Sequence, residues 1–134
     1  MDILERTFEK HSQKFFSISR FIIGFLFLCH GGQKLFSAFG GHGSMGSKKM
    51  LIAGIIEFFG GLLLSLGLGA RYVAFIAACE MIYAYTTVHA PQGLWPIQNG
   101  GELAVIYFFF FFFTIANGAG TWSLDSMLKK KKFR

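Results

Sequence analysis

Four long apolar blocks dominate this chain, over residues 15–36, 50–70, 71–90 and 101–121. The hydrocarbon core of a bilayer takes roughly 20 helical residues to cross, and each block fits that length. Only 15% of the residues are charged, against roughly 25% in ordinary soluble domains. The sequence therefore predicts an all-α fold, an integral membrane bundle of four transmembrane helices.

The charged residues gather near the two ends of the chain and divide it into three parts. We expect a cytoplasmic N-terminal segment over residues 1–14, the transmembrane bundle over residues 15–121 and a basic cytoplasmic tail over residues 122–134. The first apolar block contains ionisable side chains and lacks a convincing small-residue cleavage site. We therefore interpret it as a membrane span and not as a cleaved signal peptide.

The distribution of Lys and Arg predicts the orientation in the membrane. Of the 13 such residues, Lys34, Lys48 and Lys49 would lie near the outer helix ends if both termini are cytoplasmic, and the other ten would lie inside. Cytoplasmic loops carry an excess of Lys and Arg, so we expect both termini in the cytoplasm. The net charge of +6 then indicates contact with anionic lipid, and no nucleic-acid partner is expected.

Two glycines and one serine are expected to set the connections at the inner side. Gly67 and Gly69 lie in the stretch "GLGAR", where the second block meets the third, and can take the left-handed conformation that ends a helix. Ser123 follows the fourth block and is placed to cap a short helix that ends in the lysines.

Polar side chains within the apolar blocks are expected to converge in the outer half of the bundle. Glu57 shares a helical face with small residues such as Gly54 and Gly61, and membrane helices approach one another closely along such faces. We therefore expect Glu57 to face the bundle interior and to meet His30 or Lys34. The whole candidate pocket comprises His30, Gln33, Lys34, Glu57, His89 and Glu102.

The function of this outer cluster has two interpretations that the sequence leaves open. Charged groups inside a membrane indicate a functional site by default, whereas an ion-pair network that only holds the bundle together is the structural alternative. A metal site is not predicted, because the His and Glu residues are scattered singly and lack ligand spacing. Bis-His haem ligation by His30 and His89 is also disfavoured, because both lie near the membrane surface.

A second group of charges lies at the inner side. Arg20, Arg71 and Asp125 are expected to form a structural cluster in which the carboxylate sits between two arginines. Glu80 lies in the middle of the third block with no cation expected at its depth. We expect a neutral Glu80 that is hydrogen-bonded across helices, with a proton-relay role as the alternative.

Several of these residues fall in motifs that resemble the DoxX family of small bacterial membrane proteins. The matching segments are Arg20 with Gly24 four residues later, "HGGQKLF" at 30–36, "EFFGGLLLSLG" at 57–67, "GGE" at 100–102 and "GAGTWSLD" at 118–125. The resemblance covers about residues 16–126. It implies a four-helix bundle in the bacterial cytoplasmic (inner) membrane, and similarity to the membrane subunit of a thiosulfate:quinone oxidoreductase.

The leading hypothesis is a membrane subunit or accessory of a quinone-linked redox system, with the outer cluster as the quinone or small-molecule pocket. His30, Lys34 and Glu57 would supply hydrogen-bond donors and a proton path, and Phe36 and Phe58 would suit the ring. The chain has no Fe–S, haem or flavin motif, so it could not pass electrons alone. The partners expected are the lipid bilayer and either a soluble redox partner or further copies of the chain in a homo-oligomer. Whether the chain is catalytic stays open. The rival hypothesis is a non-catalytic membrane scaffold or a small-molecule permeation protein.

Overall fold

The computed structural model describes residues 2–43 and 47–132, which form helices joined by short loops. This confirms the all-α prediction. Short helices connect the long ones, and two glycines with positive φ, Gly67 and Gly69, form the turn between the second and third long helices as predicted. The elements are α1 (Ile3–Phe36), η1 (Ala38–Gly40), α2 (Lys48–Leu66), α3 (Ala70–Ala84), η2 (Tyr85–His89), η3 (Ala90–Gln92), α4 (Pro96–Asn99), α5 (Glu102–Asn117) and α6 (Leu124–Lys132).

Among the described residues, three helical segments are long and apolar enough to cross a membrane, namely Ile3–Phe36, Lys48–Leu66 and Ala70–Gln92. The fourth apolar helix, α5, has 16 residues and so spans about 24 Å. It ends before residue 121 because Gly118 adopts φ 84° and ψ −159°, a conformation that is essentially restricted to glycine. The chain is thus a multi-pass helical membrane protein whose last apolar helix is shorter than the sequence predicted.

Helices α1 and α2 pack in backbone contact through glycines on both helices. A Cβ atom added to Gly31 would lie 2.2 Å from the backbone nitrogen of Phe58, and one added to Gly61 would lie 2.3 Å from that of Leu28. Lipid tails give helices no hydrophobic reason to associate, so close packing of small residues supplies much of the attraction. The same close approach brings polar side chains of the two helices together.

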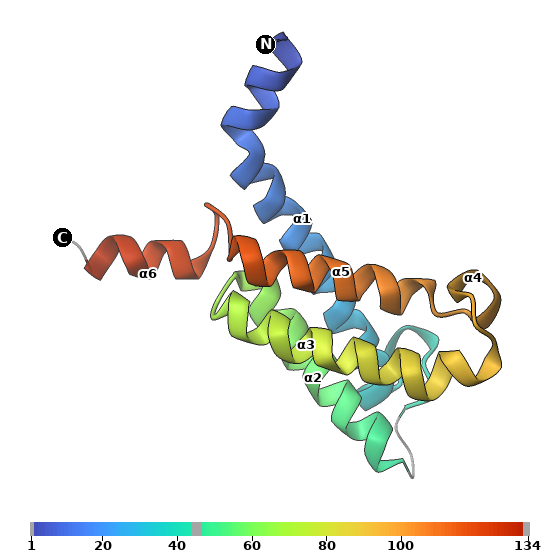
Figure 1. Cartoon of the computed structure of the whole chain (residues 1–134). Coiled ribbons are helices and arrows are strands. Elements are labelled where there is room, and N and C mark those ends of the chain that lie inside the picture. The colour runs from blue at the N-terminus through green and yellow to red at the C-terminus, as the bar shows by residue number, and fades with distance from the viewer. Residues whose placement is uncertain (1, 44–46, 133–134) are drawn as a thin grey trace.

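Helices α3 and α5 form a second pair that lies side by side with the first (Figure 1). The alanine face of α3, with Ala70, Ala74 and Ala77 fully buried, lies in the core. Aromatic rings join α1 to α5, since the ring centroids of Phe27 and Phe111 lie 4.9 Å apart. The core therefore combines small side chains of α3 with large aromatic rings of α1 and α5.

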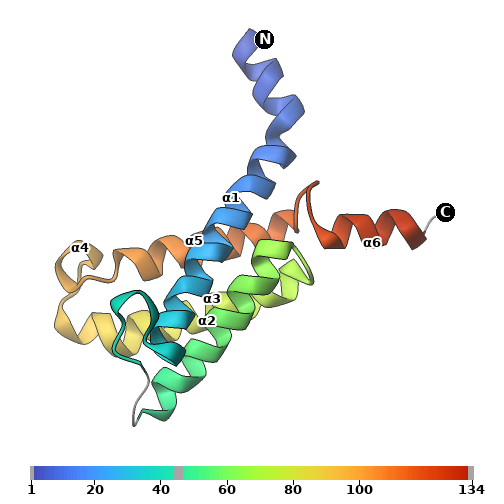
Figure 2. The same ribbon diagram turned by 180° about the vertical axis from the view of Figure 1, so that it is seen from behind.

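Two helical arms leave the bundle at the end where α2 turns into α3, as Figures 1 and 2 show from opposite sides. The first arm is the beginning of α1, over the segment predicted at residues 1–14, and a capping box of Asp2 and Glu5 starts it. The second arm is α6, which Ser123 caps as predicted by accepting a 3.2 Å hydrogen bond from the backbone N–H of Ser126. The last two residues of the basic tail lie outside the described residues.

Candidate functional site

An ion pair between α1 and α2 lies inside the bundle. Lys34 Nζ donates to Glu57 Oε1, and within residues 2–43 and 47–132 no other carboxylate is paired with a cation. Glu57 is 3% exposed, so it faces the interior as expected. Gly54 makes room for the pair, because a Cβ there would lie 3.0 Å from Lys34 Cβ. The expected contact of Glu57 with the first span therefore forms through Lys34.

Two further side chains of the bundle carry a ring with a polar group, namely His30 and Tyr107. His30 on α1 stands edge-on to Tyr107 on α5, with ring centroids 6.0 Å apart. Tyr107 is buried and rests against Phe27. The ion pair thus joins α1 to α2, and Tyr107 contacts His30 of α1 from α5. Tyr107 was not among the residues predicted for the pocket.

Glu80 on α3 is the other residue that sequence reasoning left out of the site. It is buried, and its carboxyl group lies within electrostatic reach of Glu57 and Lys34. In the described part of the chain it forms no salt bridge of its own. No side-chain hydrogen bond from Glu80 to another helix occurs in the described part of the chain, so the hydrogen bond expected there does not form.

Both carboxyl groups keep one unsatisfied oxygen. Glu57 Oε2 and Glu80 Oε2 are buried and have no hydrogen-bond partner in the described part of the chain. Buried polar atoms without partners are costly and uncommon in folded proteins. The site therefore has two free acceptor positions beside one lysine, a set of groups that can accept a proton or the donor group of a ligand.

Three of the predicted pocket residues take no part in the ion pair of Lys34 with Glu57. Glu102 is exposed at the start of α5, because α5 buries Ala104 and Tyr107 and a position two residues from Ala104 is rotated by roughly 200°. His89 Nδ1 lies 3.1 Å from the backbone oxygen of Asn99. Gln33 Nε2 donates to the backbone oxygen of Phe39 at 3.3 Å, in the connection to η1. The structure thus gives Gln33 and His89 backbone partners outside the ion pair and leaves Glu102 exposed.

The inner cluster is bound through backbone groups instead of through ion pairs. Arg20 is 1% exposed and donates to the carbonyls of Leu64 and Ser65 at the end of α2 and to those of Ala119 and Trp122. The last carbonyls of a helix lack intrahelical partners and carry partial negative charge. A guanidinium with several donors therefore satisfies several of them at once.

The carboxylate of Asp125 binds the opposite type of helix end. It accepts hydrogen bonds from the backbone N–H groups of Gly69 and Ala70 at 2.8 and 3.0 Å, at the start of α3. Arg71 donates instead to the carbonyls of Ile115 and Ala116. Asp125 forms no salt bridge with an arginine in the described part of the chain, because unpaired helix ends offer each charged group a complementary backbone partner. That the three side chains form one structural cluster stays a prediction.

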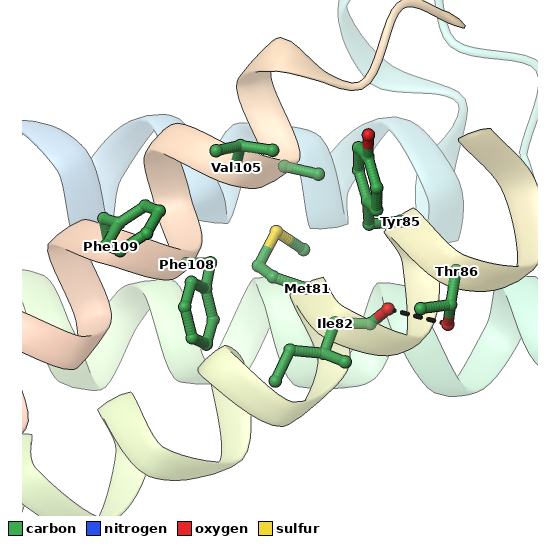
Figure 3. A pocket seen from close by; sticks show the side chains of 8 residues that line it. Met81, Ile82, Tyr85, Thr86, Val105, Phe108 and Phe109 are labelled. Atoms are coloured by element: carbon green, nitrogen blue, oxygen red, sulfur yellow. Dashed lines mark hydrogen bonds between the residues drawn. The ribbon is translucent and has the colours of Figure 1, made fainter. Parts of the chain in front are cut away.

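An apolar hollow of about 160 Å³ lies between α3 and α5, on the surface of the bundle (Figure 3). Thr86 turns its hydroxyl away from the hollow to the carbonyl of Ile82, at 2.8 Å. None of the charged residues of the site lines it. Its walls are Met81, Ile82, Tyr85, Thr86, Ala104, Val105, Phe108 and Phe109.

Among residues 2–43 and 47–132, no three His, Cys, Asp or Glu side chains come together in a group that could hold a metal ion.

Comparison with known proteins gives two matches and one absence. The DoxX family model matches residues 15–90. An uncharacterized protein of Haemophilus influenzae is 41% identical over 130 residues, which cover 92% of this chain and 97% of that protein. No solved structure shows a significant match to the chain.

Proposed function

Because this chain belongs to the DoxX family, we propose that it is the membrane subunit or an accessory of a quinone-linked redox system. The observation that carries the proposal is the buried ion pair of Glu57 with Lys34, in which Glu57 Oε2 is left without a partner. Ionisable groups inside a membrane protein are costly and mark substrate or proton pathways. A purely structural pair would satisfy both carboxylate oxygens.

The groups around Glu57 suit the headgroup of a quinone. Such a headgroup presents two carbonyl oxygens, which accept hydrogen bonds and take up protons when the quinone is reduced. Lys34 can donate to one of them, and the hydroxyl of Tyr107 and the ring of His30 are further donors on α5 and α1. Glu57 can accept and return a proton. The electrons would come from a partner protein.

The apolar hollow between α3 and α5 supports the same proposal. It is walled by side chains such as Phe108 and Met81 and opens on a surface where Ile82 and Phe109 are exposed. The isoprenoid tail of a quinone is apolar and needs an apolar binding surface, and this hollow offers one that faces the membrane. The polar site and the hollow would then bind different parts of one molecule.

The orientation of the bundle is part of the proposal. With both termini in the cytoplasm of a bacterial inner membrane, α2 runs inward from Lys48 and Glu57 lies about 14 Å from the outer end of that helix. The site would exchange protons with the outer aqueous phase. The arms formed by α6 and the beginning of α1 would then lie at the inner surface.

Those arms favour one alternative, a non-catalytic membrane scaffold. The beginning of α1 and α6 project from the bundle with exposed side chains, and the lysines of α6 follow exposed Met127 and Leu128. A scaffold would use these arms to hold a soluble partner at the membrane. A scaffold does not require unsatisfied carboxylate oxygens inside the bundle, and for this reason we favour the redox role.

Purification of the native complex separates the two proposals. The chain would be isolated from its own membranes in mild detergent, and the bound small molecules and proteins would be identified by mass spectrometry. The redox proposal predicts that a quinone and an electron-transfer protein are retained in amounts comparable with the chain. Retention of a soluble partner without any quinone would favour the scaffold and contradict the redox role.

A further inference from the structure

Glu57 and Glu80 occupy matching positions in a helical hairpin. Glu57 precedes Gly67 by ten residues, and Glu80 follows Ala70 by ten residues. At a rise of about 1.5 Å per residue, both lie roughly 15 Å from the turn that joins α2 to α3. The packed hairpin therefore brings two carboxyl groups to the same depth, although they are far apart in the sequence.

Both side chains are turned into the protein at that depth. Glu57 is 3% exposed and Glu80 is 9% exposed. Each has an Oε2 atom that is buried and has no hydrogen-bond partner among the described residues. The two carboxyl groups lie within electrostatic reach of each other, so a hydrogen-bond donor or a positive charge placed beside them would satisfy either unpaired oxygen.

The charges of the site do not balance. Lys34 is the cation bound to Glu57, and two ionised carboxylates beside one ammonium group leave one net negative charge in the bundle. A buried uncompensated charge is expensive, and a carboxylate in that position neutralises by binding a proton. One proton on the pair restores neutrality and supplies the missing donor.

We propose that Glu57 and Glu80 form a carboxyl pair that binds one exchangeable proton between α2 and α3, with Lys34 as the fixed countercharge. The proton occupies one carboxyl group as an O–H bond, and the other carboxyl group stays ionised. Two carboxylates in one site cannot both ionise comfortably, as in other carboxyl pairs that share a proton. The inference concerns proton occupancy and stands whether or not the protein works with a quinone.

The other groups that face the pair come from α1 and α5. His30 lies on α1 one helical turn before Lys34, and Tyr107 of α5 contacts the ring of His30. Of these, His30 is the alternative carrier of the proton, because an imidazole accepts one near neutral pH. If His30 carried it, both carboxyl groups would remain ionised, and this difference is measurable.

Infrared spectroscopy of the purified protein in lipid nanodiscs tests the proposal, because a protonated carboxyl group has its own C=O stretching band. The wild-type protein at neutral pH is expected to show one such band, which shifts in D₂O. The band is expected to be lost in Glu57→Gln and in Glu80→Gln, since either variant leaves one carboxylate balanced by Lys34. Glu102→Gln is the matched control, because Glu102 is exposed, and it should keep the band.

A second variant makes the opposite prediction. Lys34→Met removes the countercharge, so both carboxyl groups must bind protons and the band should roughly double in intensity. Circular dichroism would check that each variant is folded, and the wild-type spectrum alone decides the proposal if a variant is not. Absence of the band in the wild type, or its survival in both Gln variants, would overturn the proposal.

Discussion

The close contact of α1 with α2 gives the sharpest prediction about stability, and it concerns Gly31→Ala. The added Cβ atom would lie 2.2 Å from the backbone nitrogen of Phe58, whereas ordinary contact begins at 3.4 Å. The two helices would have to separate locally by about 1.2 Å, and the neighbouring contact of Gly61 with Leu28 resists that movement. Backbone atoms cannot move aside as the end of a flexible side chain can.

The size of the effect follows from two opposing contributions. Overpacking of a well-packed interior costs about 1–3 kcal/mol, and the gain in helix propensity from Gly to Ala returns up to about 1 kcal/mol. Gly32→Ala makes the same gain without the clash, because the nearest atom to its added Cβ is 3.8 Å away. Gly31→Ala should therefore be less stable than Gly32→Ala by about 1–3 kcal/mol.

The assay is unfolding in mixed micelles of mild detergent and SDS, followed by circular dichroism, with the two alanine variants compared directly. Both substitutions lie in the last turns of α1, so effects on helix formation cancel. Equal stability of Gly31→Ala and Gly32→Ala would refute the backbone contact between the helices. It would also remove the reason for Lys34 and Glu57 to meet.

Three further substitutions test the charged groups by the same unfolding assay. Lys34→Met should destabilise the bundle by about 3 kcal/mol, because Glu57 is left without its cation. Adding Glu57→Leu to the same chain should recover part of that loss. Strictly additive effects of the two substitutions would contradict the ion pair. Arg20→Lys should cost about 2 kcal/mol or more, because one ammonium group cannot reach the carbonyls that the guanidinium binds; a neutral result would contradict the clamp. Asp125→Ala should lower the free energy of unfolding by about 1 kcal/mol, because the start of α3 loses its cap. Asp125→Asn keeps one acceptor and should lower it by less. The reverse order of the two variants would contradict capping.

The helical architecture was predictable from the apolar blocks, whose length and composition leave a membrane span as the main physical solution. The left-handed glycines at Gly67 and Gly69 and the cap at Ser123 were predictable because each depends on local geometry. The early end of the last apolar helix was not, since Gly118 lies among residues that remain compatible with a span. A single glycine conformation set by its surroundings decides that boundary.

The candidate site was predictable in part. The small-residue face of α2 correctly placed Glu57 in the interior with Lys34, because helical faces follow from spacing alone. Depth along the membrane is a weaker criterion, and for that reason Glu102 and His89 were included although their side chains point elsewhere. Glu80 was missed because its depth was considered apart from α2, whereas counting residues from the shared turn would have paired it with Glu57. The binding of Arg20 to backbone carbonyls left no sequence signal, since any helix end can supply such partners.

Binding of a quinone at the polar site around Glu57 is tested by the quinone content of the purified protein. The wild type, Glu57→Gln and the exposed control Glu102→Gln would be isolated identically and extracted for quantitative mass spectrometry. Gln keeps the shape of the side chain but cannot exchange a proton or pair with Lys34 as an ion. The wild type and Glu102→Gln should therefore retain quinone, and Glu57→Gln should lose most of it. Equal quinone content in all three proteins, or none in the wild type, would contradict quinone binding at this site.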